Sequence, residues 1–310
     1  ICKTKGQPEM PIVAAIDTGE TNIVGTAVDE KGNILKEIRI PNTERNGSFI
    51  MDTYRKLIWE LDSEYEISAV GIGAGGRIDE ESGTVLYAVD IYKDYISLQI
   101  GKILENEFAV PVEVTNDCRA AVIGEHWMGA ARGAKDVFGI ILGTGVGGGY
   151  YTEGHMMRGY RGGNAEIGHM ILHPGGKKCL CGQRGCVEQY VSGTALWNLY
   201  RDKKPEATIT SGYEFFNLYA AGDETAQKVL EEFVNDLAYC IVNAANLFDP
   251  EICLIGGGLA DTSEYWWDKL KKTYSLYGNS HTKNIPLVKA AQGNRAAILG
   301  AAKLAFDVLK

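Results

Sequence analysis

Three apolar runs with the composition of β-strands follow one another near the start of the chain. They cover residues 11–19 (PIVAAIDTG), 21–29 (TNIVGTAVD) and 33–40 (NILKEIRI), and short polar turns separate them. Runs rich in β-branched residues and joined by tight turns are typical of hairpins. We therefore expect the chain to open as a three-stranded antiparallel sheet.

The pattern then changes to that of a strand–helix–strand crossover. Between Ser48 and Tyr65 the apolar residues recur at helical spacing, and residues 67–74 (ISAVGIGA) are an almost uninterrupted apolar run. The first pattern predicts an amphipathic helix and the second a strand buried on both faces, as in a parallel sheet. Three further elements are expected to complete a first lobe: a helix near 96–108, a strand at 111–115 and a helix opened by Asn116-Asp117.

The N-terminal pattern recurs in the middle of the chain. A strand-like run at 136–143 (DVFGIILG) enters a turn of glycine and threonine, and a further strand and a polar turn follow it, as at 11–29. Internal similarity of this kind indicates two lobes built on one plan. Four later elements are expected: a helix at 192–201, a long helix at 223–248, a strand at 251–258 and a helix at 294–309 capped by Asn294.

These elements predict an α/β protein with two lobes around a cleft. The N-terminal lobe is expected to span 11–118 and to include the last helix, residues 294–310, which we place against it. The C-terminal lobe is expected to span 119–293. Each lobe is long enough to bury a core of its own.

Charge and composition narrow the class of partner. The formal net charge of -9 repels phosphate backbones and acidic lipid headgroups, so we expect a small-molecule ligand, with no nucleic-acid and no membrane partner. No apolar run reaches the roughly 18 residues of a membrane helix, and the opening ICKTKGQPEM is polar. We therefore expect a cytoplasmic protein. Seven cysteines, an odd number, argue against a disulfide scaffold.

Three of the cysteines fall within eight positions of one loop. Cys179, Cys181 and Cys186 supply three thiols, and His169 precedes the first of them by ten residues. Three thiolates and one imidazole are a donor set of closed structural zinc sites, and the interleaved glycines favour a loop bent around an ion. His173 is an alternative histidine ligand that the spacing leaves open. The competing interpretations are unrelated buried cysteines or a disulfide within the cluster.

A closed metal site would hold this loop in shape, because it leaves no coordination position for a reacting water. Glu166 lies three residues before His169, and Glu188 lies two residues after Cys186. The metal would therefore draw two carboxylates and an imidazole toward one place, which would suit a polar sugar pocket. The competing interpretation is that both glutamates are simply solvated.

Taken in order, the motifs of the chain resemble those of one family. They are IDTGET near the start, ND at 116–117, GTGVGGG at 143–149, EIGH at 166–169, CxCGxxGCxE at 179–188 and GGG at 256–258. This set resembles the ROK family of sugar kinases and sugar-responsive repressors, within the actin/hexokinase-like ATPase superfamily. The resemblance implies two lobes of ribonuclease H-like fold, with ATP and a sugar meeting in the cleft.

The resemblance implies roles for individual residues. Asp117 would be the catalytic base, although the residues alone favour a helix cap there. His169 would bind zinc through one ring nitrogen and donate to the sugar through the other. Together with Asp117, the sugar-binding residues would be Gly76, Arg77, Asn116, Glu166, His169 and Glu188.

The same resemblance implies an ATP site built from glycine-rich turns, where bare backbone can approach phosphate. Asp17 would reach Mg²⁺ through water. The competing interpretation is that the same glycines only form hairpin turns and the turn between a strand and a helix. The implied nucleotide residues are Asp17, Gly19 and Thr21 in the first motif, Gly143, Thr144, Gly145, Gly147 and Gly148 in the second, and Gly256, Gly257 and Gly258 on the adenosine side.

Two features depart from the usual pattern of the family. The first motif usually reads Asp-x-Gly-Gly-Thr, and Glu20 here replaces its second glycine, adding bulk and negative charge where the triphosphate should pass. If the chain is a kinase, we expect Glu20→Gly to lower the apparent KM for ATP. The run GGRIDEESGTVLY from Gly75 resembles the N-acetylmannosamine kinase branch, whereas Asp90 stands where many members have a sugar-binding Asn.

We therefore expect an ATP-dependent sugar kinase with a structural zinc ion. Its substrate would be N-acetylmannosamine, N-acetylglucosamine or glucose, and the resemblance implies a homodimer or homotetramer. The alternative is a non-catalytic sugar sensor, like the family's transcriptional repressors, in which Glu20 has compromised the ATP site.

Overall fold

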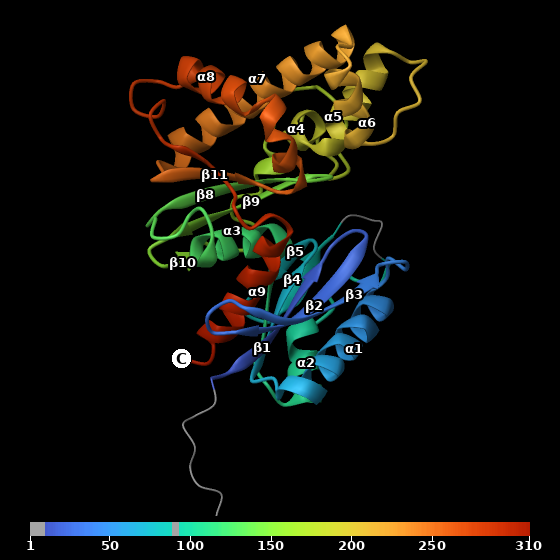
Figure 1. Ribbon diagram of the computed structural model, residues 1–310, viewed down its shortest axis with the longest axis vertical. Coiled ribbons are helices and arrows are strands. Elements are labelled where there is room, and N and C mark those ends of the chain that lie inside the picture. Colours follow the sequence, from blue (N-terminus) through green and yellow to red (C-terminus); the bar gives the residue numbers. More distant parts are fainter. Residues whose placement is uncertain (1–9, 89–92) are drawn as a thin grey trace, which may run out of the picture. The chain divides into compact units, whose positions relative to one another are not determined.

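The computed structural model describes residues 10–88 and 93–310, which form two compact units (Figure 1). Unit 1 comprises the described residues up to Met128 together with Arg158–Gly163 and Arg295–Lys310. Unit 2 comprises Gly129–Met157 and Asn164–Asn294. No helix in the described ranges combines the length and the apolar character that a membrane span requires.

Unit 1 is built on a five-stranded mixed sheet. The first three strands along the chain form the expected antiparallel meander, and the next two run parallel to the first. The strand order is β3 (Ile34–Pro41), β2 (Asn22–Asp29), β1 (Ile12–Thr18), β4 (Ala69–Ala74) and β7 (Val112–Asn116).

The two faces of this sheet carry different helices (Figure 1). Ala14 and Ile16 of β1 belong to a core shared with α1 (Gly47–Tyr65) and α2 (Ile100–Phe108). Val13 and Ala15, which point the other way, pack with α9 (Ala296–Asp307). This alternation is the period of two expected of a strand that is buried on both faces. A small hairpin, β5 (Arg77–Asp79) and β6 (Thr84–Tyr87), completes the strands of unit 1.

Two predicted helix starts are corrected by the structure. The helix expected near 96–108 begins at Ile100, because Ser97 has a left-handed backbone (φ 69°) and its N–H bonds the Val85 carbonyl. Asn294 does not cap the last helix. It lies in a 3₁₀ turn, Gly293–Arg295, and Arg295 occupies the cap position without a side-chain hydrogen bond.

Unit 2 repeats the sheet of unit 1, which confirms the prediction of one plan used twice. Three antiparallel strands are again followed by two strands parallel to the first. The order is β10 (His155–Met156), β9 (Val146–Thr152), β8 (Val137–Leu142), β11 (Ile252–Gly256) and β12 (Leu287–Lys289).

The helices of unit 2 share one core with its sheet. The long helix α7 (Glu224–Phe248) begins where Asp223 accepts a hydrogen bond from the Ala226 N–H, as a cap residue does. The helix predicted at 192–201 is α5 (Gly193–Lys203). Three further helices were not predicted: α4 (Glu188–Val191), α6 (Gly212–Ala220) and α8 (Trp267–Tyr277).

Helix α3 (Asp117–Met128) packs against α9 backbone to backbone within unit 1. A Cβ atom on Gly300 would lie 1.7 Å from the Ala120 carbonyl oxygen, and one on Gly124 would lie 1.9 Å from that of Ala296. Because of this packing α3 belongs to unit 1, so the change of unit at Met128 comes ten residues after the expected lobe boundary at 118.

Candidate functional site

Two aspartates meet at the carboxyl edge of the unit 1 sheet. Asp17 near the end of β1 pairs with Gly73 of β4, and Gly73 pairs with Thr115 of β7, two residues before Asp117. A Cβ atom on Gly73 would lie 3.7 Å from Asp17 Oδ1 and 3.5 Å from the Asp117 Cα. Asp17 and Asp117 therefore lie beside the same residue of the middle strand.

Both carboxyl groups have perturbed acidities. Burial raises the pKa of Asp17 to about 7, and the neighbouring charge of Asp117 adds to the rise. Burial also raises the pKa of Asp117, against hydrogen bonds that favour its ionised form. Asp117 Oδ1 accepts the Cys118 N–H at 2.8 Å and the Asn116 Nδ2 at 2.8 Å. A buried carboxyl group held by donors in this way is fixed in place and can take up a proton.

Asn116 links this edge to the loop before the small hairpin. Its Nδ2 donates to the Gly76 carbonyl oxygen at 3.0 Å, and its Oδ1 accepts the Cys118 and Arg119 N–H groups at 3.0 and 3.2 Å. Asn116 therefore performs the capping role at the start of α3. Among the sugar-binding residues predicted in unit 1, the structure thus brings together Gly76, Asn116 and Asp117, with Arg77 next along the chain.

The first glycine turn, between β1 and β2, contains an ion pair that the sequence did not reveal. Glu20 Oε1 lies 2.8 Å from the Arg45 Nη2, and both side chains are about two-fifths exposed. Gly19 in the same turn accepts a hydrogen bond from Asn42 Nδ2 at 3.0 Å, and Thr21 Oγ1 accepts one from Asn22 Nδ2 at 3.1 Å. Arg45 lies 25 residues beyond Glu20, so no local motif could have found it.

The second glycine turn, between β8 and β9, is held by Glu188. Its Oε2 accepts the Val146 N–H at 3.0 Å, and a Cβ atom on Gly145 would lie 2.3 Å from that oxygen. The Gly143 N–H closes the turn on the Gly145 carbonyl at 2.9 Å. Glu188, predicted as a sugar ligand, therefore also supports the predicted phosphate turn. Of the remaining residues predicted there, Thr144 is exposed, and Gly147 and Gly148 pair with β8.

The third glycine group follows β11, the parallel neighbour of β8. Gly256 ends that strand opposite Ile141, and Gly257 has a left-handed backbone (φ 87°). A Cβ atom on Gly257 would lie 2.3 Å from the Leu142 carbonyl oxygen, so only glycine fits. At Gly143 and Gly258, by contrast, a Cβ atom would meet no other atom within 4 Å, so bare backbone faces open space there.

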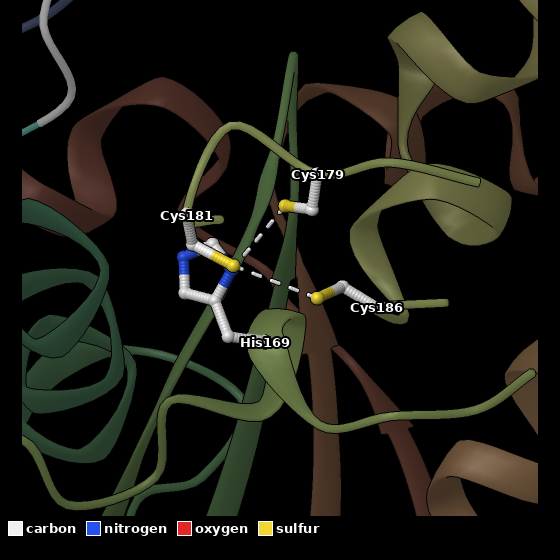
Figure 2. A group of neighbouring side chains, drawn as sticks. All are labelled: His169, Cys179, Cys181 and Cys186. Carbon is white, nitrogen blue, oxygen red and sulfur yellow. Dashed lines mark hydrogen bonds between the residues drawn. The ribbon is translucent and has the colours of Figure 1, made fainter. Parts of the chain in front are cut away.

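The cysteine cluster brings four candidate ligands together (Figure 2). The sulfur atoms of the three cysteines and a ring nitrogen of His169 all lie within 4.8 Å of one another. Cys181 Sγ lies 3.6 Å from Cys186 Sγ, and Cys179 Sγ lies 3.8 Å from His169 Nδ1. All six cysteines that the structure describes are free thiols, so no disulfide forms within the cluster.

The structure places the two candidate histidines differently. His169 closes the short 3₁₀ helix Ile167–His169, and its ring faces the three sulfur atoms (Figure 2). His173 instead points its Nε2 to Asp236 Oδ1 of α7, at 2.9 Å. The His173 ring also packs on Tyr190, with ring centroids 4.3 Å apart. His173 therefore ties the loop to α7 and does not join the thiols.

Glu166 precedes the 3₁₀ helix that carries His169. Its side chain is exposed, and its carbonyl oxygen accepts the His169 N–H at 3.0 Å. Ala165, just before it, has a left-handed backbone (φ 59°), which is uncommon for a residue with a Cβ atom. Asp90, which departs from the family pattern, lies outside the described residues.

Comparison with known proteins gives consistent matches along the chain. The model of the ROK family matches residues 13–308. Glucokinase of Streptomyces coelicolor is 33% identical over 96% of this chain and 98% of its own length. N-acetyl-D-glucosamine kinase of Aliivibrio fischeri is 31% identical over 93% of this chain and 97% of its own length. The structure of a ROK family glucokinase from Streptomyces griseus, in complex with glucose and AMPPNP, superposes with a TM-score of 0.83 at 32% identity, covering 96% of this chain and 99% of that one.

Proposed function

The chain belongs to the ROK family and is a carbohydrate kinase with the actin/hexokinase-like fold, and we propose that it phosphorylates a hexose or N-acetylhexosamine with Asp117 as general base. The observation that carries this proposal is the environment of Asp117. Burial raises its pKa, and Asn116 and the Cys118 N–H hold one carboxylate oxygen. The group is thus oriented and basic enough to accept a proton.

In the proposed reaction the attacking sugar hydroxyl gives its proton to the Asp117 carboxylate. The hydroxyl oxygen forms a bond to the γ-phosphorus of ATP, and the bond from that phosphorus to the bridging oxygen breaks, releasing ADP. Most of the catalysis of phosphoryl transfer comes from positioning and charge neutralisation. The Asn116 Nδ2 donates hydrogen bonds to Asp117 Oδ1 and to the Gly76 carbonyl, so Asn116 would position the base relative to the sugar.

The glycine turns fit a nucleotide. In unit 2, Gly143 and Gly258 present bare backbone to open space at neighbouring parallel strands, as a phosphate and an adenosine would require. Thr144, Gly145, Gly147 and Gly257 would complete that half. In unit 1, Gly19 and Thr21 would bind phosphate, and Asp17 would hold Mg²⁺ through water. A bound cation would favour the ionised form of Asp17, whose burial opposes it.

The four candidate ligands fit zinc. A tetrahedral zinc ion with bonds of about 2.3 Å to sulfur and 2.0 Å to nitrogen separates its ligand atoms by roughly 3.5–3.8 Å. Two separations in the cluster, of 3.6 and 3.8 Å, match this geometry, and all four ligand atoms lie within 4.8 Å of one another. His169, Cys179, Cys181 and Cys186 would therefore hold the ion and fix the loop that begins at Glu166. The other nitrogen of His169 would then donate to the sugar.

The choice of sugar draws on two kinds of support. The curated relatives include a glucokinase and an N-acetyl-D-glucosamine kinase. The loop at Gly75-Gly76-Arg77 resembles that of N-acetylmannosamine kinases. In unit 2, Glu166, His169 and Glu188 would contact the sugar hydroxyls. The expected homodimer or homotetramer and the cytoplasmic location stay predictions.

The proposal is tested by ATP-dependent ADP release from the zinc-loaded protein, measured with N-acetylmannosamine, N-acetylglucosamine, glucose, mannose, fructose and allose. We expect turnover on a hexose or N-acetylhexosamine. Asp117→Asn should lower kcat by about 10²–10⁴-fold while sugar binding persists. An Asp117→Asn variant that keeps its kcat would remove Asp117 as the base. Sugar binding without turnover on any of the six would favour the non-catalytic sensor.

A further inference from the structure

Glu20 introduces a negative charge into the proposed phosphate turn, and the structure shows what stands beside it. The Arg45 Nη2 lies 2.8 Å from Glu20 Oε1, so the two charges compensate each other at the turn itself. Both side chains are about two-fifths exposed. Such an exposed pair contributes little to stability. Its effect on a nearby ligand charge does not depend on that contribution.

The segment that carries Arg45 is docked onto the glycine turn. The Asn42 N–H donates to the Thr21 carbonyl at 2.9 Å, and Asn42 Nδ2 donates to the Gly19 carbonyl at 3.0 Å. With the ion pair from Arg45 to Glu20, every residue of the turn from 19 to 21 contacts this one segment. The position of the segment therefore sets the position of the turn.

The backbone of Arg45 is also fixed from its other side. The Lys93 N–H donates to the Arg45 carbonyl at 3.1 Å, and the Gly47 N–H donates to the Lys93 carbonyl at 2.8 Å. A Cβ atom on Gly47 would lie only 2.1 Å from the Asp94 carbonyl oxygen, so the backbones around Gly47 and Asp94 are in direct contact. Next to it, Asn46 caps α1 by accepting the Phe49 N–H at 2.8 Å. The backbone that carries the Arg45 side chain is thus held by hydrogen bonds on both sides.

We infer that Arg45 is a positioning residue for ATP, which holds and neutralises Glu20 so that a triphosphate can bind at a turn that carries a carboxylate. This inference rests on the proposed nucleotide site. Without Arg45, the Glu20 carboxylate would face the phosphates unpaired and repel them. Two unit charges about 10 Å apart interact by enough to change an affinity roughly 15-fold when the effective dielectric constant is about 20, and partial screening at low salt reduces this to roughly fivefold.

The test is a double-mutant cycle on the zinc-loaded protein. Arg45→Gln is expected to raise the KM for ATP, and the calorimetric Kd for AMPPNP with Mg²⁺, roughly fivefold at low salt, with kcat changed less than about twofold. Glu20→Gln should leave both constants at or below those of the wild type. The double variant should return them to within about twofold of the wild type, because the repelling charge is gone.

Arg39→Gln is the matched control. Arg39 also forms an exposed ion pair, with Glu37 at 2.7 Å on β3, and it should change neither constant. The effect of Arg45→Gln should also shrink as salt rises, because exposed charges are screened. Binding unaffected by Arg45→Gln would overturn the inference. So would a double variant as weak as the single one, since Arg45 would then contact the phosphates directly.

Failure of the inference and failure of the proposed nucleotide site give different results. If Asp17→Asn leaves the Kd for AMPPNP with Mg²⁺ unchanged, the proposed site itself is wrong. If Asp17→Asn weakens binding and Arg45→Gln does not, the site stands and only the role of Arg45 is refuted.

Discussion

Asp17 and Asp117 are both buried beside Gly73, where a Cβ atom would lie 3.7 Å from Asp17 Oδ1 and 3.5 Å from the Asp117 Cα. Their proximity follows from the strand order β1–β4–β7, which puts the ends of β1 and β7 on the two sides of β4. Burial raises the pKa of Asp17 to about 7, and the neighbouring charge of Asp117 adds to the rise. The proposed site therefore costs stability in the free protein.

This cost predicts how stability depends on pH. The pKa of Asp17 rises from 3.8 in the unfolded chain to about 7 in the folded one, so the folded state binds more protons between these values. Stability should therefore fall as the pH rises from about 4 to 7 and then level off. Asp17→Asn removes the effect, and without Mg²⁺ it should raise the free energy of unfolding by roughly 2–4 kcal/mol at pH 8.

Urea unfolding of both proteins at pH 4, 6 and 8 measures this difference. It should be small at pH 4 and largest at pH 8, and the same variant should have lost kinase activity. A difference that does not grow with pH would mean that Asp17 is ionised throughout in the folded protein.

The cysteine cluster predicts that substitutions of two histidines in the same loop differ in their effect on zinc binding. His169→Gln removes one of the four proposed ligands, so the protein should lose zinc to a chelator that the wild type resists. His173→Gln should retain one zinc per chain, because His173 bonds Asp236 and a Gln amide can replace that hydrogen bond. Elemental analysis after dialysis against the chelator gives the result. Equal loss from both variants would contradict the assignment of His169.

A third prediction concerns Glu80, whose carboxylate is almost fully buried beside the proposed base. It accepts hydrogen bonds from the Thr115 hydroxyl and, at 3.0 Å, from the Arg119 Nη1, and it lies 3.1 Å from the Arg158 Nε. Glu80→Gln removes the carboxylate charge that lies 3.0 Å from the buried Arg119 Nη1 and should destabilise unit 1 by about 3 kcal/mol. Since Thr115 and Arg119 flank Asn116-Asp117, kcat should fall as well.

Arg158→Gln is the comparison for Glu80. Arg158 also pairs with the Glu80 carboxylate, but its side chain is 58% exposed. The loss of its charge should therefore lower the free energy of unfolding by less than about 1 kcal/mol. Thermal unfolding of the two variants measures the contrast. Equal shifts in Tm would show that burial of Arg119 is not what makes Glu80 important.

The sequence predicted what depends on local pattern. The runs rich in β-branched residues predicted β1 to β3, the helical spacing predicted α1, and the spacing of the cysteines predicted the cluster. The family motifs predicted the fold class and a carbohydrate kinase, and the comparisons with known proteins confirm both. The strand β12 was missed because its three residues carry too little periodicity, and the helices α6 and α8 were missed as well.

Pairs that the tertiary fold creates could not be predicted either. Glu20 meets Arg45 across 25 residues, Glu80 meets Arg119 across 39, and Glu188 meets the Val146 N–H across 42. Each pair depends on which strands are neighbours and in which register. The same limit applied to His169 and His173, whose spacing from the cysteines allowed either to be the ligand until their rings were placed.

The contact between α3 and α9 gives a prediction in which helix propensity and packing have opposite signs. An Ala in place of Gly300 improves the propensity of α9 by about 1 kcal/mol. Its Cβ atom, however, would lie 1.7 Å from the Ala120 carbonyl, so the backbones of the two helices must move apart. We expect Gly300→Ala to lower the free energy of unfolding by about 2 kcal/mol or more, and to lower kcat, because α3 begins at Asp117.

Gly212→Ala is the control. Gly212 lies in the first turn of α6, and its Cβ atom would lie 3.8 Å from the nearest atom, the Gly193 carbonyl oxygen. This substitution should leave Tm unchanged or raise it. Differential scanning calorimetry of both variants decides the question: a Gly300→Ala protein at least as stable as the wild type would show that the close approach of the two helices is not needed to hold Asp117 in place.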